Sequence, residues 1–450
     1  MRRRPCRAAE TGGNCSGERT DRRRRYPKSR ERSARQRTLA ETPEFRLIGR
    51  VTALAEAPVT LPTPEADGAS TAPRSERLLS LDVFRGLTVA GMLLVNQPGD
   101  WGAIYPPLEH AAWNGWTPTD LIFPFFLFIV GVTTHLSIAS RRRRGDDEQT
   151  IVRHIVQRGA LIVLCGLLLA SFPWWPLERI ASMRFPGVLQ RIGVAYVFGA
   201  LFTLRGGLKR QLLILVALLY GYWFVMTVLP VPGSGDMGQL VLDQPPASIA
   251  AWLDRAVFGS HLWRSSQTWD PEGLLSTVPA IGTVILGVFT GRWIAQRIPM
   301  EERLVGLFGA GALATMGGLM WNWSFPINKN LWTSSYVLFT AGVAALTLGT
   351  CIWLIDVRSV QWWTKPFTWF GRNPLLAFLG TGLMSRTIYS LVRIQRDDGT
   401  TASLQRTIYE YGYASWLSPK DASLLFAMSY VALWALILWA LDRRRLYWKV

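Results

Sequence analysis

The sequence predicts an all-α membrane protein: a polytopic bundle of about ten transmembrane helices with both termini in the cytoplasm. Hydrophobic residues make up 49% of the 450-residue chain and charged residues only 18%, below the roughly 25% charged residues of soluble proteins. Apolar runs of about 18 to 22 residues recur along the chain, and such a run is long enough to cross a bilayer as a helix. These features exclude a disordered chain, a disulfide scaffold and an ordinary cytosolic enzyme.

Residues 1–75 are predicted to form a basic, disordered extension. Residues 1–50 contain 16 Lys or Arg and 6 Asp or Glu, a net charge of +10 out of the chain's +18. The segment is rich in Arg, Pro, Ser and Gly and has no periodic apolar face. Two interpretations stay open: a polybasic segment held against anionic lipid, or a start codon assigned too early, since the next methionine after Met1 is Met92. Because the basic charge is concentrated here, we expect no nucleic-acid partner.

The remaining domain, residues 76–450, contains ten candidate spans. They lie at 78–96, 118–139, 155–173, 187–204, 211–229, 274–294, 304–320, 334–355, 373–391 and 422–441. One set of alternate connections contains 19 Lys or Arg residues and the other set contains 9. Basic connections stay in the cytoplasm, so the set that includes Arg141 to Arg144 is predicted to lie inside. The outer connections are longer and rich in Trp, which indicates a built surface or, for most of these residues, the aromatic belt of the membrane interface.

One of the four histidines, His110, is a candidate catalytic residue. It lies in the outer connection before the second span, in a segment that also carries Trp113 and Asn114. The run TPTD at 117–120 predicts a helix start in which Asp120 serves as a reciprocal cap, or alternatively as a catalytic group, and this cap would hold the preceding segment in place. Trp113, Asn114 and Asp120 are candidates for substrate binding. A neutral histidine near the aqueous face could act as a general base on an amine or hydroxyl, or as a nucleophile toward an acyl group.

A buried charge enters the fourth span from outside. Gln190 and Arg191 follow a Pro-Gly pair by about one helical turn. A charge at this depth in a membrane indicates a functional site by default, and both residues are candidates for substrate binding. The alternative is that Arg191 pairs with Glu178 or Asp120 to hold the bundle together.

Two further outer segments offer polar groups to an acceptor. Asp270 and Glu272, just before the sixth span, could receive a sugar amine, although a role at the start of a helix explains them almost as well. A Trp-rich loop supplies groups suited to hydrogen bonds with a sugar or an acyl carbonyl: Asn328, Lys329 and Asn330. Lys329 could alternatively pair with a carboxylate across the site.

Several motifs occur in a recognisable order over about residues 76–445. They are ERLLSLDVFRG, the VN that ends the first span, H-x-x-W-N-G-x-T-x-x-D-L-x-F-P, PGVLQRIGVAY, DPEGLLSTVPAIGT and PINKNLWTSSYV. In this order they resemble the heparan-α-glucosaminide N-acetyltransferase family and its bacterial relatives. The resemblance implies a multi-pass acyltransferase that moves acetyl from cytoplasmic acetyl-CoA to a sugar amine or hydroxyl on the other side of the membrane. It also implies that His110 is the active histidine and that Asn96 acts with it.

The donor site that the resemblance implies should lie on the inner side. Asp82 and Arg85 share one face of the first span near its inner end, as a pair inside the bundle or as an interfacial anchor. The phosphates of coenzyme A need cations, and the inner connections supply candidates, together with one amide: Arg205, Lys209, Arg210, Lys365, Arg372 and Asn373. The positive-inside bias would place these cations there without any ligand. No pattern of metal ligands is evident, so we expect acetyl-CoA as co-substrate and no metal.

The resemblance is specific for the family rather than for the acceptor. The sequence shows no counterpart of the long lumenal N-terminal region of the animal enzymes, so we expect a cell-envelope polysaccharide, glycolipid or amino sugar rather than heparan. The expected location is a bacterial inner membrane, with membrane lipids as neighbours and with a homodimer left open. A transporter or flippase for a glycolipid or sugar, without acyl transfer, is the alternative function.

Overall fold

The apolar runs form helices whose ends are set by local caps. The structure is a computed structural model that describes residues 78–175, 178–397 and 399–448, so the expected extension at 1–75 lies outside it. Within the described part, eight helical segments are long and apolar enough to cross a membrane. They are α3 (Leu79–Asn96), α4 (Pro118–Arg143), α5 (Glu148–Ser171), α8 (Leu208–Thr227), α10 (Leu274–Ile294), α11 (Met300–Trp321), α12 (Ser334–Cys351) with its π-helical continuation η4 (Ile352–Val357), and α16 (Pro419–Arg443).

The two other expected spans are shorter helices. α7 (Val188–Leu204) is apolar and has 17 residues. α14 (Pro374–Arg386) has 13 residues and continues into the π-helical turn η5 (Thr387–Leu391). The prediction of an all-α polytopic bundle is confirmed. The count of ten spans and the cytoplasmic placement of the termini stay predictions.

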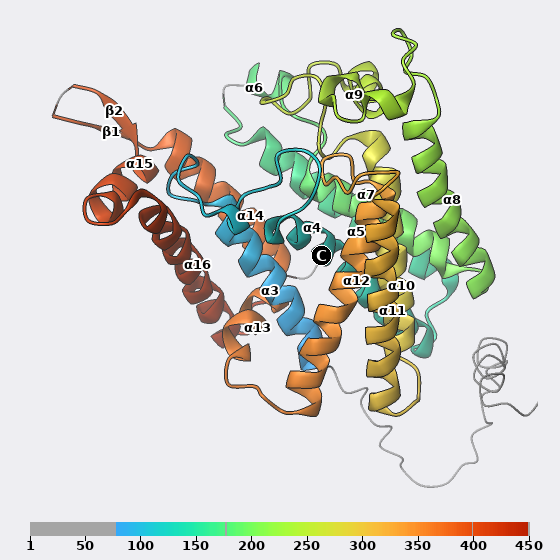
Figure 1. Ribbon diagram of the computed structural model, residues 1–450. Coiled ribbons are helices and arrows are strands. Elements are labelled where there is room, and N and C mark those ends of the chain that lie inside the picture. The colour runs from blue at the N-terminus through green and yellow to red at the C-terminus, as the bar shows by residue number, and fades with distance from the viewer. Residues whose placement is uncertain (1–77, 176–177, 398, 449–450) are drawn as a thin grey trace, which may run out of the picture. The chain divides into compact units, whose positions relative to one another are not determined.

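The remaining elements are short. They are the helices α6 (Glu178–Ala181), α9 (Ile249–Phe258), α13 (Thr364–Arg372) and α15 (Leu404–Tyr409), the 3-10 turns η1 (Pro106–Leu108), η2 (Gly238–Val241) and η3 (Pro245–Ala247), the π-helical turn η6 (Glu410–Ala414), and the strands β1 (Arg393–Gln395) and β2 (Thr401–Ser403). The two strands pair antiparallel, with Ile394 opposite Ala402. They form a hairpin that projects beside α15 (Figure 1).

Two helices extend beyond the apolar windows that predict them. α5 begins at Glu148, seven residues before the expected start at 155, because the Asp147 side chain caps it by accepting the Thr150 amide N–H at 3.3 Å. α4 runs on to Arg143 through the arginine run instead of ending at 139. Hydropathy marks the membrane-embedded part of a helix, whereas caps set where the helix begins and ends.

The centre of the bundle consists of α4, α10 and α12, which lie side by side (Figure 1). α4 and α10 approach closely through facing glycines: a Cβ on Gly131 would lie 2.1 Å from the Val284 carbonyl oxygen, and one on Gly287 would lie 2.1 Å from that of Phe128. The core beside this contact includes the fully buried side chains of Trp332 and Tyr336. This close packing fixes the position of α4, whose first turn carries Asp120.

The bundle has two chemically different ends. We call the end that carries Arg141 to Arg144 the inner end and the opposite one the outer end. The connections 97–117, 228–273 and 322–333 lie at the outer end, where α4 and α12 begin and α3 ends. At the inner end, α13 packs against α3 so tightly that a Cβ on Gly371 would lie 1.9 Å from the Asp82 carbonyl oxygen. That approach places Arg372 next to the start of α3.

Candidate functional site

The loop before α4 folds back so that His110 meets the first turn of the helix. The Nδ1 atom of His110 lies 2.7 Å from Oδ1 of Asp120. The other carboxylate oxygen of Asp120 accepts the amide N–H groups of Ala111 and Thr117, each at 3.0 Å. Asp120 therefore caps the helix, as predicted, and also orients His110. An Asp120 carboxylate that accepts the Nδ1 proton leaves Nε2 of His110 as the free base.

The exposure of these two side chains differs sharply. The Asp120 side chain is 1% exposed, whereas that of His110 is 44% exposed. Tyr336 donates its hydroxyl hydrogen to the backbone carbonyl of Asp120 and so fixes the same turn from beneath. The result is a buried, rigid carboxylate that holds an accessible imidazole at the outer end of the bundle.

Lys329 approaches the same pair from the loop before α12. Its Nζ lies 2.9 Å from Nδ1 and 3.2 Å from Nε2 of His110, and 3.5 Å from Oδ1 of Asp120. The predicted alternative that Lys329 pairs with a carboxylate is confirmed. Burial lowers the pKa of the Lys329 ammonium, although Asp120 and Glu272 oppose that shift. The site thus contains a base and a nearby cation held by one carboxylate.

The His110 loop and the Lys329 loop are joined by a pair of amides. The amide of Asn328 donates to the side-chain oxygen of Asn114 at 3.1 Å. Asn328 is fully buried, and its own side-chain oxygen accepts the Leu331 amide N–H at 2.9 Å. Asn114 also donates to Asp243. These bonds occupy Asn114 and Asn328, so both residues position the two loops relative to each other.

Arg191 is a fully buried cation close to this centre. It hydrogen-bonds the Ser276 hydroxyl, and its guanidinium lies 5.0 Å from the centre of the Trp332 ring. Its Nε and Nη1 atoms have no hydrogen-bond partner among the described residues. Of the two partners expected for it, Asp120 bonds instead to His110 and Lys329, and the side chain of Glu178 lies outside the described residues. Arg191 therefore retains unused donors.

The two carboxylates before α10 form ion pairs with an arginine that was not among the predicted site residues. Asp270 and Glu272 both bind Arg184, whose Nε lies 2.8 Å from Oδ2 of Asp270. Although burial opposes the charge, the two carboxylates raise the pKa of Arg184. Because Asp270 is buried and already paired, it has little capacity left for a sugar amine. One feature of the sequence could have identified Arg184 as a candidate: it is one of only two basic residues in the outer connection 174–186.

The other predicted outer residues take different places. Asn96 is the last residue of α3, exposed at the same end of the bundle as His110 but outside the contacts described above. Trp113 donates its indole N–H to the Leu242 carbonyl at 2.9 Å. Gln190 lines a separate outer cavity beside α7. Asn330 is half-buried in the loop of Lys329.

A cavity of about 360 Å³ lies between α3, α4, α5, α7 and α14. Its inner end carries Arg85, Arg158 and Arg372, and its wall includes Phe123, one turn after Asp120. Arg85 also donates to the Gly371 carbonyl at 2.9 Å. Two of these cations are predicted donor-site residues, whereas Arg158 is not, because the positive-inside bias accounts for it without a ligand. His110 is not among the residues that line this cavity or the outer one.

The remaining predicted donor residues separate into two groups. Asp82 is buried next to Arg85, and Asn373 is buried with its side-chain oxygen accepting the Trp448 amide N–H at 3.0 Å. Four other residues are exposed and do not line the cavity: Arg205, Lys209, Arg210 and Lys365. Arg205 instead pairs with Glu148 at 2.9 Å. The structure therefore brings only some of the predicted cations together.

Comparison with known proteins identifies the family. A model described as "Heparan-alpha-glucosaminide N-acetyltransferase, catalytic" matches residues 77–317. The human heparan-alpha-glucosaminide N-acetyltransferase is 27% identical over 424 residues, which cover 83% of this chain and 60% of the human protein. The mouse protein of the same name is 28% identical over 428 residues, with 84% and 61% covered. The chain thus spans about 60% of the length of these curated relatives. Because the model covers more than half of the sequence, the chain belongs to the heparan-alpha-glucosaminide N-acetyltransferase family.

Proposed function

We propose that this protein is an acetyltransferase that moves acetyl from acetyl-CoA to the amine or hydroxyl of a sugar at the outer face of the membrane. The observation that carries the proposal is the triad of contacts among His110, Asp120 and Lys329 in a member of this family. A buried carboxylate that fixes one nitrogen of a partly exposed imidazole leaves the second nitrogen as the basic one, and a general base or a nucleophile needs this arrangement. The proposed location is the inner membrane of a bacterium.

The proposed donor site is the cavity that begins at Arg85, Arg158 and Arg372. These guanidinium groups would bind the phosphates of coenzyme A, because Arg forms strong, charge-assisted hydrogen bonds with phosphate oxygens. The apolar walls formed by α4, α5 and α7 suit the pantetheine arm. Phe123 lines this cavity one turn after Asp120, and its ring centre lies 4.9 Å from that of Trp332. The acetyl group would have to pass the Phe123 ring to reach His110.

In the direct route, His110 acts as a base. Nε2 of His110 takes a proton from the acceptor nitrogen or oxygen as that atom attacks the thioester carbonyl carbon. The carbon–sulfur bond then breaks, and His110 returns the proton to the sulfur of coenzyme A. Lys329 and the unused donors of Arg191 supply positive charge for the oxyanion that forms on the carbonyl oxygen. Asp120 stabilises the imidazolium in between.

In the covalent route, His110 is the nucleophile. Nε2 attacks the thioester carbonyl, the carbon–sulfur bond breaks, and coenzyme A leaves as the thiol with a proton from solvent. The acceptor then attacks the acetyl-imidazole and loses its own proton, so His110 is restored. Asn96, exposed at the same end of the bundle, would hydrogen-bond the carbonyl in either route.

One experiment tests the function and separates the routes. The purified full-length protein is incubated with radiolabelled acetyl-CoA, with and without a panel of amino sugars, and quenched in acid. We expect label transfer to a sugar in the wild type and none in His110→Asn. Protein-bound label without acceptor supports the covalent route, and its absence supports the direct route. A folded wild-type protein that never consumes acetyl-CoA would overturn the proposal in favour of a transporter.

A further inference from the structure

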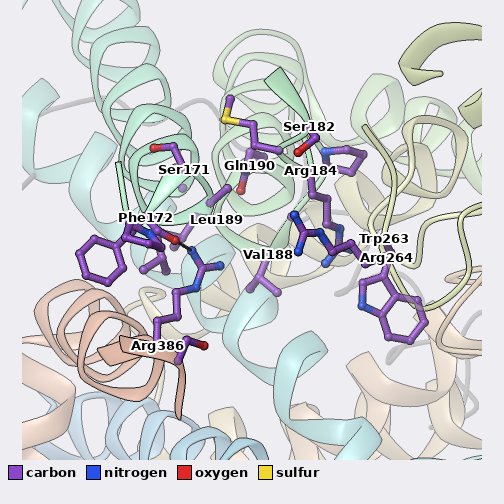
Figure 2. Close-up of a pocket in the computed structure, with 18 of the residues that line it drawn as sticks. Ser171, Phe172, Ser182, Arg184, Val188, Leu189, Gln190, Trp263, Arg264 and Arg386 are labelled. Atoms are coloured by element: carbon purple, nitrogen blue, oxygen red, sulfur yellow. Dashed lines mark hydrogen bonds between the residues drawn. The ribbon is translucent and has the colours of Figure 1, made fainter. Parts of the chain in front are cut away.

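A second cavity lies at the outer end of the bundle, and His110 is not among its lining residues. It has a volume of about 740 Å³ and lies between the end of α5, the segment before α7, and the end of α14. Its floor is formed by Val188 and Leu189, residues that also line the cavity proposed for acetyl-CoA (Figure 2). The outer cavity is therefore next to the donor path but separate from it.

Four arginines surround this cavity. Arg386 lies on one wall, and Arg184 and Arg264 lie on the opposite wall (Figure 2). The fourth, Arg393, comes from β1. No acidic residue is among the described lining residues. Guanidinium groups gathered around one cavity repel one another, and an anion bound between them would relieve this repulsion.

Only one of the four arginines is neutralised. Arg184 is bound by Asp270 and Glu272. Arg386 donates to the Phe172 carbonyl at 3.3 Å, which leaves its charge uncompensated. In the part of the chain that the structure describes, Arg264 and Arg393 have no carboxylate partner either. Among the described lining residues and their ion-pair partners, four guanidinium groups and two carboxylates give a formal charge of +2.

This charge and these donors fit a phosphate group. A phosphate monoester or a diphosphate diester carries about two negative charges near pH 7, and the planar Arg donors match its oxygens in pairs. A ligand with a single carboxylate would compensate only half of the formal charge of +2. Hydroxyl and amide groups in the same lining offer further hydrogen bonds: Ser171, Ser182, Gln190 and Ser390.

A row of indole rings connects the cavity to the His110 loop. Trp263 lines the cavity, and its ring centre lies 5.7 Å from that of Trp269. Trp269 in turn lies 5.2 Å from Trp113, three residues after His110. Indole faces pack well against the C–H faces of sugar rings. A sugar whose phosphate lies among the arginines could therefore extend along this row toward His110.

From these observations we infer that the outer cavity binds the phosphate or diphosphate of the acceptor, so that the acetylated molecule is a phosphate-bearing sugar. The identity of the bound molecule as acceptor rests on the proposed function, whereas phosphate binding does not. Two sources share this chemistry: a free sugar phosphate, and a sugar linked through phosphate to a lipid. Trp174 and Trp175 lie beside the cavity and are strongly exposed. Because Trp favours the membrane interface, these residues fit the second source, a sugar linked through phosphate to a lipid.

Binding is tested with the full-length protein in detergent by isothermal titration calorimetry, using inorganic pyrophosphate and geranyl diphosphate as probes. The test variant is Arg264→Gln/Arg393→Gln, since both side chains are exposed and their loss should not disturb the fold. We expect pyrophosphate to bind the wild type saturably and the double variant about 100-fold more weakly, because each charge-assisted contact is worth about tenfold or more. Arg386→Lys provides a second, conservative variant, with an expected loss of about tenfold.

Controls separate this inference from the proposed catalysis. Arg406→Gln removes an outer arginine that pairs with Glu410 and does not line the cavity, and it should bind pyrophosphate like the wild type. His110→Asn should also bind it normally, so a failure of acetyl transfer leaves this result intact. Tighter binding of geranyl diphosphate than of pyrophosphate identifies the lipid-linked source, and equal binding identifies the free one. Absence of saturable binding of both probes, or wild-type affinity in the arginine variants, overturns the inference.

Discussion

The two ends of the bundle bind their charges in different ways. At the outer end, Asp120 is buried and makes close contacts with His110, Lys329 and two backbone amides. At the inner end, Arg85 pairs with Asp82 and also donates to the Gly371 carbonyl. Arg372 pairs with Asp442 at 2.8 Å, and Arg158 lies over the ring of Tyr196 at 5.3 Å. The outer site is thus a network in which each group fixes the next, whereas the inner cations are held separately.

This difference predicts different responses to mutation. In a network, the loss of one member changes the geometry and charge of the others, so effects on the chemical step should be large. Cations that have separate partners contribute to binding one at a time, so their effects should be smaller and additive, and those of the exposed ones should be sensitive to salt. The outer site should therefore govern kcat, and the inner cavity should govern KM for acetyl-CoA.

The largest effect is expected for Asp120→Asn. The amide cannot stabilise an imidazolium and can orient the His110 ring in the wrong tautomer, so we expect kcat for acetyl transfer to fall by about 10²- to 10⁴-fold. Asp421→Asn is the matched control, because Asp421 lies in the first turn of α16, accepts from Tyr105 at 2.6 Å and is not among the described partners of His110. Equal losses of activity in both variants would mean that Asp120 acts only through helix stability.

The next effect concerns Lys329 and pH. Because its pKa is lowered, Lys329 loses its proton at a lower pH than an ordinary lysine, whose pKa is about 10.4. If transfer needs this cation, kcat should decline on the alkaline side below that value. Lys329→Arg keeps the positive charge at all these pH values, so the alkaline decline of kcat should move to higher pH. Lys329→Met removes the charge and should lower kcat about 10- to 100-fold over the whole pH range. Identical pH profiles for wild type and Lys329→Arg would contradict this role.

A smaller effect is expected at the inner end from Arg158→Gln. The loss of one charge-assisted phosphate contact should raise KM for acetyl-CoA about tenfold with little change in kcat, and the effect should shrink at high salt. Arg205→Gln is the matched control, since Arg205 is exposed, pairs with Glu148 and does not line the cavity. A drop in kcat at unchanged KM in Arg158→Gln would break the contrast between the two ends.

The sequence was sufficient for the bundle but only partly for the site. Apolar runs predict spans because one continuous segment must be long enough to cross the membrane. The TPTD run predicts the cap at Asp120 because a helix cap is likewise formed by residues close together in the sequence. The contact between His110 and Lys329 joins residues 219 positions apart, and its geometry depends on how two loops pack. The residues themselves could be selected because polar groups in Trp-rich outer loops are unusual, but their bonds to each other could not.

The arginines show a second limit of the sequence. Arg85, Arg158 and Arg372 line the inner cavity, but only Arg85 and Arg372 were predicted donor residues, because topology alone explains a basic residue at the position of Arg158. Arg205 belongs to the same class and turns outward to Glu148. Which face of a helix points into the bundle is set by packing contacts such as that of Gly371 with the Asp82 carbonyl, and these depend on the partner helix.

The smallest predicted effect tests whether the buried charge at the outer end costs stability. Burial raises the pKa of Asp254, in α9, to about 6, while its carboxylate accepts the Leu274 amide N–H at 2.9 Å. An unfolded Asp has a pKa of about 3.9, so the folded state binds this proton more tightly. Its contribution to stability is present below about pH 4 and is lost as the pH rises to about 6.

Asp254→Asn keeps an oxygen acceptor for Leu274 and removes the charge. We expect its apparent Tm to exceed that of the wild type by a few degrees at pH 7.5 and by less at pH 5, as measured by scanning fluorimetry in detergent. Asp236→Asn, in an exposed outer loop, should match the wild type at both values. If the advantage of Asp254→Asn were the same at both pH values, the charge would not be its cause. Because the inner cations are more solvated, neutralising Arg205 should produce no comparable gain, which extends the contrast between the two ends from catalysis to stability.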